Sequence, residues 1–507
     1  MENRLQGHVE KLSENPSLRK GRFERKIDAQ AAIYTSSLKD DIRIFRPIVQ
    51  VNIAHAIMLL DQGIISKSDA SGILKALLSL NEKDPSTLEM PPELEDIHMV
   101  IEEFVAKEAG ESGQKLHTGK SRNDQVVAAI KIALRKELVE VCESISSLIN
   151  SLVAQAEKNL TTVMPGYTHT QVAEPTTFAH LLSAYSFCFL RDLRRLEATF
   201  EFLNSCPMGA CALAGTSLPV NRGEVANLLG FKRIDENTMD AVGSRDFILH
   251  AMSALSIAMV NLSRLAEEVI LMASSEFGML ELPDEFSSTS SIMPQKKNPV
   301  VAEIVRAKAS RVIGNLTSAL SLLKSLPQAY NLDYQELTPL LWSTVDETKA
   351  AFTIMAKMFE KLSPRPEVME AKASEGFSAA TELASELVRS GIPFREAHSI
   401  VGRVVLNATK SGKKMAEITP EDIARAAEEV CGKKVEISPE RLSEVLDVRK
   451  VVAMRSLPGG PSQKSVSQQL KEIKNELRNY SKILEKRKKA LKNAESDLLK
   501  KARERMK

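Results

Sequence analysis

Aromatic residues are scarce in this chain of 507 residues. Phenylalanine, tyrosine and tryptophan make up 5% of it, and Trp342 is the only tryptophan. The interior must therefore be filled by aliphatic side chains, methionine and alanine, which favours helices packed on helices. With 43% hydrophobic and 26% charged residues, the composition is ordinary for a soluble globular protein and excludes a largely disordered chain.

Cysteine is scarce as well, and the cysteines form no motif. Their number is odd, and the sequence contains neither a Cys-x-x-Cys pair nor a repeated metal-ligand spacing. We therefore expect reduced, buried thiols and a cytoplasmic location. The five residues are Cys142, Cys188, Cys206, Cys211 and Cys431.

Long apolar runs are missing too. Residues 1–8 lack the apolar core of a signal peptide. Of the two long uncharged runs, 202–221 is broken by glycines and prolines, and 247–263 contains His250 and several serines. Neither is an unbroken apolar span of roughly 20 residues. We expect no membrane segment, and we expect 247–263 to be a buried helix.

Signatures of cofactors and metals are also absent from the sequence. There is no Gly-x-Gly-x-x-Gly after a strand, no Walker loop, no Gly-x-Ser-x-Gly elbow and no histidine–carboxylate spacing typical of zinc. We therefore expect a reaction that needs neither a cofactor nor a metal.

What the chain does have is long helical periodicity. Apolar side chains recur every three or four residues over 127–152, 248–272 and 305–326. This pattern predicts three long amphipathic helices. A further helix is expected to begin near Pro175, after the break at Pro165. The predicted fold class is all-α, with a central bundle of long helices.

Turn residues divide the chain into regions. The clearest break, Ser-Pro-Arg-Pro at 363–366, reads as a linker. We predict an N-terminal domain at 1–111, a central long-helix domain at 112–362 and a small helical domain at 363–469. Residues 470–507 would form a basic helical extension.

This extension is unlike the rest of the chain. Residues 471–507 carry a local net charge of +8, so the remainder carries about −6. Apolar residues keep heptad spacing from Leu470 to Leu498, with one position missed. The extension could pack against a partner or its own protein, or it could be a solvated tail. No RNA-binding or DNA-binding motif accompanies it, so we do not expect a nucleic-acid partner.

Residues 287–299, Ser-Ser-Thr-Ser-Ser-Ile-Met-Pro-Gln-Lys-Lys-Asn-Pro, hold the densest set of reactive groups. Hydroxyl groups are followed by two lysines, and Asn298-Pro299 reads as an N-cap and a first helical residue. A loop that ends at a positive helix terminus suits an anionic substrate. Serine-rich loops are common, however, so local chemistry supports catalysis and an ordinary loop about equally.

Two further segments carry binding or acid–base candidates. Residues 117–124 bring Lys120, Arg122 and Asn123 to the start of the first long helix. There they could bind the carboxylates of a ligand, or they could serve only to cap the helix. The turn at 165–175 presents His169 among polar neighbours. It is the best acid–base candidate, although a lone histidine is more often structural.

Two other segments are less specific. Residues 329–336 offer Tyr330 and Gln335 as neutral hydrogen-bonding groups. The Glu-Asp-Ile-His segment at 95–98 fits either a binding or a structural role.

The motifs together resemble a known family. Residues 290–299, Ser-Ser-Ile-Met-Pro-x-Lys-x-Asn-Pro, are similar to the signature of the fumarase, aspartase and argininosuccinate lyase superfamily. The form Gln-Lys-Lys-Asn at 295–298, joined to Thr-Gly-Lys-Ser-Arg-Asn-Asp-Gln at 118–125, resembles the argininosuccinate lyases. Residues 240–247 and 393–402 extend the resemblance, which covers most of the chain and fades after about Leu470.

The resemblance implies a three-domain, all-α subunit in a homotetramer whose active sites each use segments of three subunits. It also implies reversible elimination of fumarate from argininosuccinate, leaving arginine, without a cofactor. Ser290 would remove a proton and His169 would protonate the departing nitrogen, with Glu303 orienting His169 across the subunit interface. Which of the pair is the base stays open. The implied substrate contacts are Ser37, Arg122, Asn123, Thr168, Lys296, Asn298, Tyr330 and Gln335.

Three positions depart from the family pattern. Thr289 replaces a usual glycine, Thr338 a lysine that would bind a substrate carboxylate, and Leu332 a frequent arginine. The substrate is therefore less firmly implied than the reaction. The alternatives are a sister lyase acting on aspartate, malate or adenylosuccinate, and an inert structural protein with the same fold.

Overall fold

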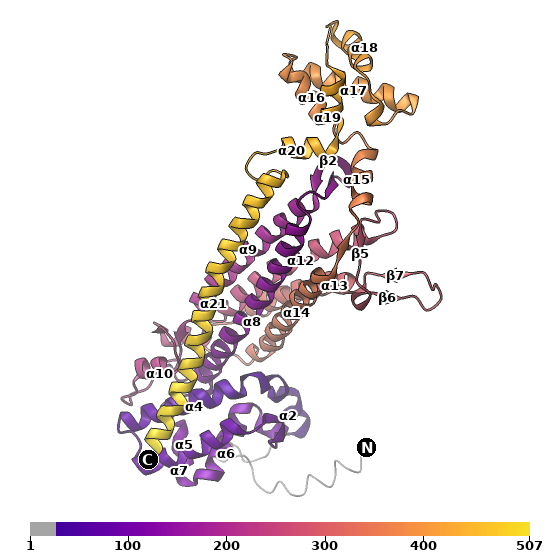
Figure 1. Cartoon of the computed structure of the whole chain (residues 1–507). Helices are drawn as coiled ribbons and strands as arrows, with labels where there is room; N and C mark the ends of the chain where they lie inside the picture. The colour runs from indigo at the N-terminus through magenta and orange to yellow at the C-terminus, as the bar shows by residue number, and fades with distance from the viewer. Residues whose placement is uncertain (1–26) are drawn as a thin grey trace.

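Long helices give the molecule its elongated form (Figure 1). The computed structural model describes residues 27–507. The start of the predicted N-terminal domain, including residues 1–8 that lack a signal-peptide pattern, lies outside the described residues. The all-α prediction is confirmed, because within residues 27–507 the strands are short and occur only as four two-stranded pieces. The domain boundaries stay predictions.

The N-terminal region is a set of helices at the lower end of Figure 1. Its central element is α4, which is buried along most of its length and packs against α5 and α8. The elements are α2 (Ala29–Thr35), α3 (Leu38–Asp41), η2 (Ile42–Ile44), α4 (Phe45–Asp61), α5 (Lys67–Glu82), η3 (Pro85–Thr87), η4 (Pro92–Leu94), α6 (Ile97–Ala109), α7 (Glu111–Gln114) and η5 (Lys115–His117).

Five long helices form the central bundle. They are α8 (Arg122–Lys158), α9 (Phe178–Phe202), α12 (Asp246–Ala273), α13 (Val300–Leu323) and α14 (Tyr334–Lys361). Helix α8 packs along α14 and α9, and α12 packs along α13. The three helices predicted from periodicity are α8, α12 and α13, and all three are confirmed, although α13 ends three residues before the predicted position. Shorter helices α10 (Arg222–Leu228) and α11 (Thr238–Gly243) precede α12.

The helix predicted to begin near Pro175 is confirmed as α9, but it begins three residues later. Strand β1 (Val163–Thr168) pairs antiparallel with β2 (Gln171–Thr177), and Pro175 lies opposite Pro165 in this hairpin. Helix α9 begins only at Phe178, where Thr177 is the N-cap and its side chain accepts from the backbone N–H of His180. A proline before a helical pattern can therefore belong to a strand edge instead of a first helical turn.

The remaining strands are two residues long. Their bounds are β3 (Ser205–Cys206) with β4 (Arg233–Ile234), β5 (Leu280–Glu281) with β8 (Ser363–Pro364), and β6 (Ser288–Thr289) with β7 (Lys297–Asn298). The last pair closes a loop that stands out from the bundle on the right of Figure 1.

A group of small helices with its own hydrophobic core lies at the upper end of Figure 1. They are α16 (Ala380–Arg389), α17 (Phe394–Ser411), η7 (Met415–Glu417), α18 (Pro420–Cys431), α19 (Pro439–Leu446) and α20 (Val448–Met454). Helix α15 (Pro366–Glu375) precedes this group and adds no residue to its core. Helices α15 and α20 contact the β1–β2 hairpin, which joins this end to the bundle.

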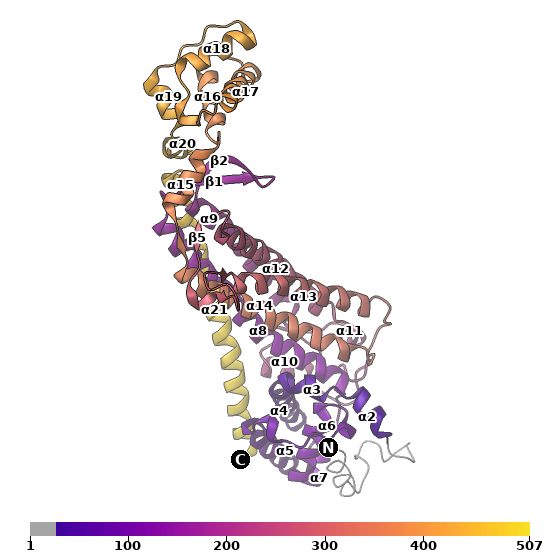
Figure 2. The ribbon, with the colours of Figure 1, turned by 90° about the vertical axis from the view of Figure 1, so that its right-hand side faces the viewer.

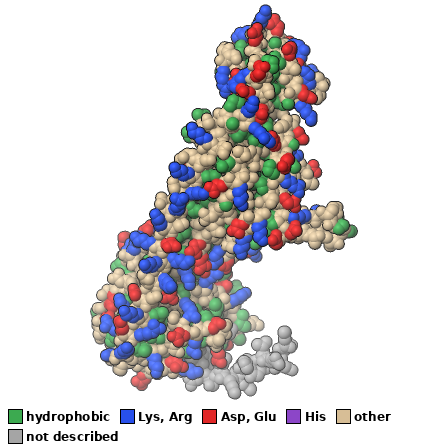
Figure 3. Space-filling view, viewed as in Figure 1, with side chains coloured by type: hydrophobic (Ala, Val, Ile, Leu, Met, Phe, Trp, Pro, Cys, Tyr) green, Lys and Arg blue, Asp and Glu red, His purple; other side chains and the backbone are tan. Residues whose placement is uncertain are grey.

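Helix α21 (Gln463–Met506) returns along the whole body to the N-terminal helices (Figures 1 and 2). Its heptad residues, including Leu477 and Leu484, are buried against α8 and α9, and its last turns pack on α4 and α5. The Ser71 hydroxyl donates to the carbonyl of Met506 at 2.8 Å, and Arg505 pairs with Asp61 at 2.8 Å. Of the possibilities left open by the sequence, packing on its own protein is the one observed. Lysine and arginine follow its outer face, with acidic residues among them (Figure 3).

The end of α21 should stabilise the N-terminal region. Leu498 is 2% exposed, so Leu498→Ala should lower the free energy of unfolding by about 2–5 kcal/mol. Lys500→Ala, at an exposed position two residues away, should change it by less than about 0.5 kcal/mol. Urea unfolding of both variants tests this. Equal effects would mean that the last turns of α21 do not stabilise the fold.

All five cysteines are unpaired. Cys142 and Cys206 are buried as predicted, but the other three are only half-buried. Two stretches, Ala29–Asp61 and Asp246–Ala273, are long and apolar enough to cross a membrane by composition, yet 72% and 56% of their most apolar windows are buried in the fold. We interpret both as core segments. The second contains the buried helix predicted at 247–263.

Candidate functional site

A polar cavity of about 280 Å³ lies where the N-terminal helices meet the starts of α8 and α14. Five of the implied substrate contacts and two of the departing positions line it. Its lining includes Thr35, Ser37, Asp41, Glu95, Asp96, His98, Arg122, Asn123, Arg245, Tyr330, Leu332, Tyr334, Gln335 and Thr338. The sequence separation of these residues shows that the fold, and not local spacing, builds the cavity.

The start of α8 places two of the predicted residues. Ser121 is the N-cap and forms a capping box with Asp124, so Arg122 and Asn123 are the first two helical residues. The second Asp124 oxygen accepts from the backbone N–H of Cys211 at 2.8 Å, which ties the helix start to the next loop. Capping is thus done by Ser121 and Asp124, and the side chains of Arg122 and Asn123 line the cavity.

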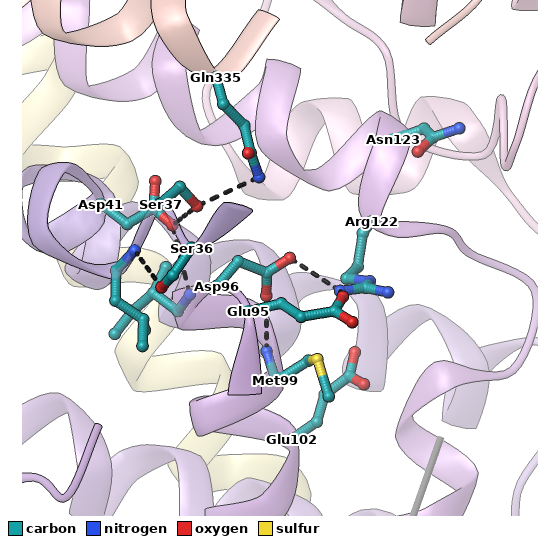
Figure 4. Close-up of polar contacts among 12 residues, drawn as sticks. Ser36, Ser37, Asp41, Glu95, Asp96, Met99, Glu102, Arg122, Asn123 and Gln335 are labelled. Atoms are coloured by element: carbon teal, nitrogen blue, oxygen red, sulfur yellow. Dashed lines mark hydrogen bonds and ion pairs between the residues drawn. The ribbon is translucent and has the colours of Figure 1, made fainter. Parts of the chain in front are cut away.

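Arg122 is held by carboxylates (Figure 4). Its guanidinium lies 2.8 Å from Asp96 and 3.4 Å from Glu95. Arg245 differs, because it is buried, donates to the carbonyls of Val242 and Ser244, and lies over the ring of Tyr334. The cavity therefore offers both signs of charge, as a zwitterionic ligand requires.

Ser37, Asp41 and Gln335 form a chain of hydrogen bonds on the opposite wall (Figure 4). The Ser37 hydroxyl donates to Asp41 at 2.7 Å, and the Gln335 amide donates to the Ser37 hydroxyl at 3.4 Å. Burial raises the pKa of the Asp41 carboxyl to about 7. This carboxyl could lose its proton on meeting a cationic ligand group.

Asp41 should make stability depend on pH. Because its pKa is raised from 3.8 to about 7, the folded protein keeps a proton that the unfolded chain loses, so stability falls as pH rises between these values. From pH 4 to 8, the free energy of unfolding of the natural protein should fall by at most about 4 kcal/mol relative to that of the Asp41→Asn variant. Urea unfolding of both proteins at several pH values measures this difference in the free energy of unfolding. A difference that does not change with pH would contradict the assignment to Asp41.

The segment 329–338 lines the cavity as well. Tyr330 is half-buried and packs edge-on against Tyr334, with ring centroids 5.8 Å apart. Thr338 turns its hydroxyl back to the carbonyl of Tyr334 at 3.4 Å, and Leu332 is exposed. At the positions of the lysine and arginine of the family pattern, this chain thus presents no charge to the cavity.

Thr168 and His169 lie elsewhere, at the tip of the β1–β2 hairpin. Both are exposed, and His169 and Thr170 take positive φ values of 54° and 58°. Such angles at both central residues are those of a type I′ hairpin turn, which side chains other than glycine and asparagine rarely adopt. The turn holds His169 out from the body, and Figure 2 shows the hairpin projecting from the bundle.

The β6–β7 loop is the third location of predicted site residues. It carries Ser290, Lys296 and Asn298. The Ser290 hydroxyl accepts from the backbone N–H groups of Ile292 at 3.3 Å and Met293 at 3.1 Å. Two such donors would stabilise negative charge on this oxygen. Lys296 is exposed and Asn298 half-buried. In Figure 3 the loop stands away from the body.

The predicted cap at Asn298 is wrong. Asn298 lies in β7 opposite Ser288, and α13 begins at Val300 with Pro299 as an N-cap that makes no side-chain hydrogen bond. Strand pairing across the loop keeps Asn298 extended. Thr289 pairs with Lys297 in the same ladder. The side chain of Asn298 instead donates to the Ser288 hydroxyl at 3.4 Å.

The predicted site residues of the cavity, of the hairpin and of the loop do not come together within one chain. The cavity, the hairpin and the loop lie at separate places along the body in Figure 1. Glu303 is exposed on the first turn of α13, and within residues 27–507 it makes no hydrogen bond with His169. Within one chain, these residues therefore do not form a single site.

The sequence did not single out several residues of the cavity. Asp41 lies outside the segments singled out above, and Arg245 was visible only within the motif at 240–247. His98, in the ambiguous segment 95–98, is buried, and burial lowers its pKa to about 4. Over the described part of the chain, no three histidine, cysteine, aspartate or glutamate side chains are placed to hold a metal ion.

Comparisons with known proteins bear on this geometry. A family described as "Lyase" matches residues 21–314, and one described as "Argininosuccinate lyase C-terminal" matches residues 377–453. An argininosuccinate lyase of Methanothermobacter thermautotrophicus is 43% identical over 460 residues, which are 90% of this chain and 98% of the relative. The chain belongs to the argininosuccinate lyase family. A second member, from Methanocaldococcus jannaschii, is 42% identical over 92% of this chain and 95% of its own length.

Solved structures agree with this membership. The crystal structure of EDDS lyase in complex with formate superposes with a TM-score of 0.86 at 30% identity, covering 96% of this chain and 97% of that one. A class II fumarase from Schistosoma mansoni, at 18% identity and a TM-score of 0.70, shows the fold alone. The fold and family predicted from the sequence are thus confirmed.

Proposed function

We propose that this chain catalyses the reversible elimination of fumarate from argininosuccinate, leaving arginine, as the last step of arginine biosynthesis. The observation that carries the proposal is the match to argininosuccinate lyases over nearly their whole length, at 43% identity for the Methanothermobacter relative. The cavity adds chemical support, because its carboxylates and cations suit the amino and carboxylate groups of an amino acid. The enzyme would act in the cytoplasm, where its unpaired thiols stay reduced.

The functional unit would be a homotetramer with active sites shared between three subunits. Large apolar side chains lie exposed on two bundle helices, which a second copy could cover. They are Ile257 and Val260 on α12, and Ile304, Ile313 and Leu320 on α13. The separation of cavity, hairpin and loop within one chain gives a second reason for the assembly.

The chemistry assigns a role to each group. Elimination removes a proton from the carbon beside a carboxylate, so negative charge builds up on that carboxylate before the nitrogen leaves. Ser290 would take the proton as an alkoxide, whose negative charge the two backbone donors would stabilise, and would become a neutral hydroxyl. His169 would protonate the departing nitrogen, and Glu303 of another subunit would orient it.

The substrate contacts fall into two sets. Lys296 and Asn298 of the loop, Thr168 of the hairpin, and Arg122 and Asn123 of the cavity would hold the succinyl end. The arginine end would lie against Ser37, Tyr330 and Gln335. No cofactor or metal takes part in this scheme.

A substrate panel tests the proposal. Release of fumarate, followed by ultraviolet absorbance, should occur with argininosuccinate and not with aspartate, malate or adenylosuccinate. Release from one of the other substrates instead would make the protein a sister lyase. No release from any of them would favour a structural protein that keeps the fold.

A further inference from the structure

A second cavity, of about 880 Å³, lies between the middle of α8 and the last third of α21. We call it the α8–α21 cavity. Its walls come from α8, α21, the start of α4 and the middle of α14, and its floor is apolar, with Ile132, Val139, Leu491 and Leu498. It is about three times as large as the cavity of the candidate active site.

Basic side chains that have no carboxylate partner surround this cavity. Lys136 and Lys492 are exposed at its rim, and neither makes an ion pair within residues 27–507. Arg46 is not counted with them, because it donates to the carbonyl of Lys83 and interacts electrostatically with the Asp84 carboxylate. Among the acidic residues of the lining, Glu495 alone has no cationic partner in the described chain. The unpaired charges of the cavity are therefore mostly positive.

The other charges of the lining cancel. Lys349 lies 3.0 Å from Glu137 and 2.8 Å from Glu140, and Lys488 lies 2.7 Å from Glu143. Arg43 lies 3.7 Å from Glu137, so three cations face three carboxylates. These pairs leave no acidic excess to neutralise Lys136 and Lys492. An anion entering the cavity would therefore meet an uncompensated positive field.

One cation of the lining is buried. Arg135 is 3% exposed, donates to the carbonyls of Leu229 and Gly230, and has no carboxylate partner in the described part of the chain. Its Nε atom has no hydrogen-bond partner there either. A buried, unpaired guanidinium is unfavourable by itself, and the positive charge it adds acts through a medium of low dielectric constant.

We propose that the α8–α21 cavity binds a small organic anion that carries a phosphate or pyrophosphate group. The charged group would lie between Lys136 and Lys492 in the field of Arg135, and the organic part would cover the apolar floor. Three stretches of the chain line both this cavity and the candidate active site. Asp41 at the end of α3 is followed by Arg43 in η2, Ile130 by Ile132 on α8, and Thr338 by Lys349 on α14. The ligand would thus bind back to back with the reaction site, at a place separate from it.

Calorimetric titration of the full-length protein tests the proposal, with inorganic pyrophosphate and ADP as the two probes. Lys136→Ala/Lys492→Ala should weaken binding of both at least tenfold. Lys482→Ala/Lys489→Ala removes the same charge from exposed positions of α21 outside the cavity, and should leave binding unchanged. Tighter binding of ADP would identify an organic phosphate as the ligand, and equal affinities would identify a free phosphate.

Three results would overturn the inference. They are no heat from either probe, equal losses in the two double variants, and unchanged affinity in Lys136→Ala/Lys492→Ala. Unchanged affinity in this double variant would mean that the probe binds elsewhere on the protein. Because none of the four lysines belongs to the proposed reaction site, fumarate release should stay normal in both variants, and the proposed function is tested separately.

Discussion

Ser290→Ala is expected to lower the turnover of argininosuccinate by at least about 10³-fold. The substitution removes the oxygen that would take the proton and toward which the backbone N–H groups of Ile292 and Met293 point. The loop should keep its place, since β6 and β7 pair through backbone groups of other residues. Fumarate release at saturating substrate measures the loss, and gel filtration should show an unchanged assembly.

Ser291→Ala is the matched control. Ser291 is the exposed neighbour on the same loop, and no role is assigned to it. The turnover of the Ser291→Ala variant should lie within about twofold of the turnover of the natural protein, because loss of an exposed hydroxyl changes the stability and structure of a protein little. Similar losses in both variants would show that the loop, and not the Ser290 hydroxyl, matters.

His169→Asn is expected to lower turnover by about 10²–10⁴-fold, the usual contribution of a positioned acid or base. The strained turn should tolerate this change, because asparagine accepts positive φ better than most residues do. The Michaelis constant should change little if His169 acts mainly in the transition state.

His398→Asn controls for the loss of a histidine. His398 is exposed on α17, in the small helical group at the far end, and should be silent. A silent His169→Asn variant would remove His169 from the mechanism and leave Ser290 as the single candidate of the pair.

The bundle could be predicted from the sequence because its pattern is local. Helices α8, α12 and α13 repeat apolar residues every three or four positions, so periodicity alone located them. The hairpin was missed because Pro165 and Pro175 are turn residues by local rules, whereas their pairing across the hairpin decides the structure. Asn298 was misassigned for the same reason, since Ser288 pairs with it from ten residues away.

The site was predictable as a set of residues and not as an arrangement. Local chemistry and the family resemblance pointed to Arg122, Asn123, Tyr330 and Gln335, and the fold brings them to one cavity. Local chemistry did not single out Asp41 or Arg245 as site residues, because their importance comes from burial beside distant elements. Association of copies, which no local pattern encodes, would decide how Ser290 and His169 reach that cavity.

Mixing two inactive variants tests the shared site most directly. Ser290→Ala and His169→Asn chains, unfolded and refolded together in equal amounts, form mixed tetramers at random. If each site takes its loop and its hairpin from different subunits, about a quarter of the sites regain both groups, so fumarate release from argininosuccinate should return to about a quarter of the natural level. Activity no higher than that of the two variants refolded separately would contradict a site shared between subunits.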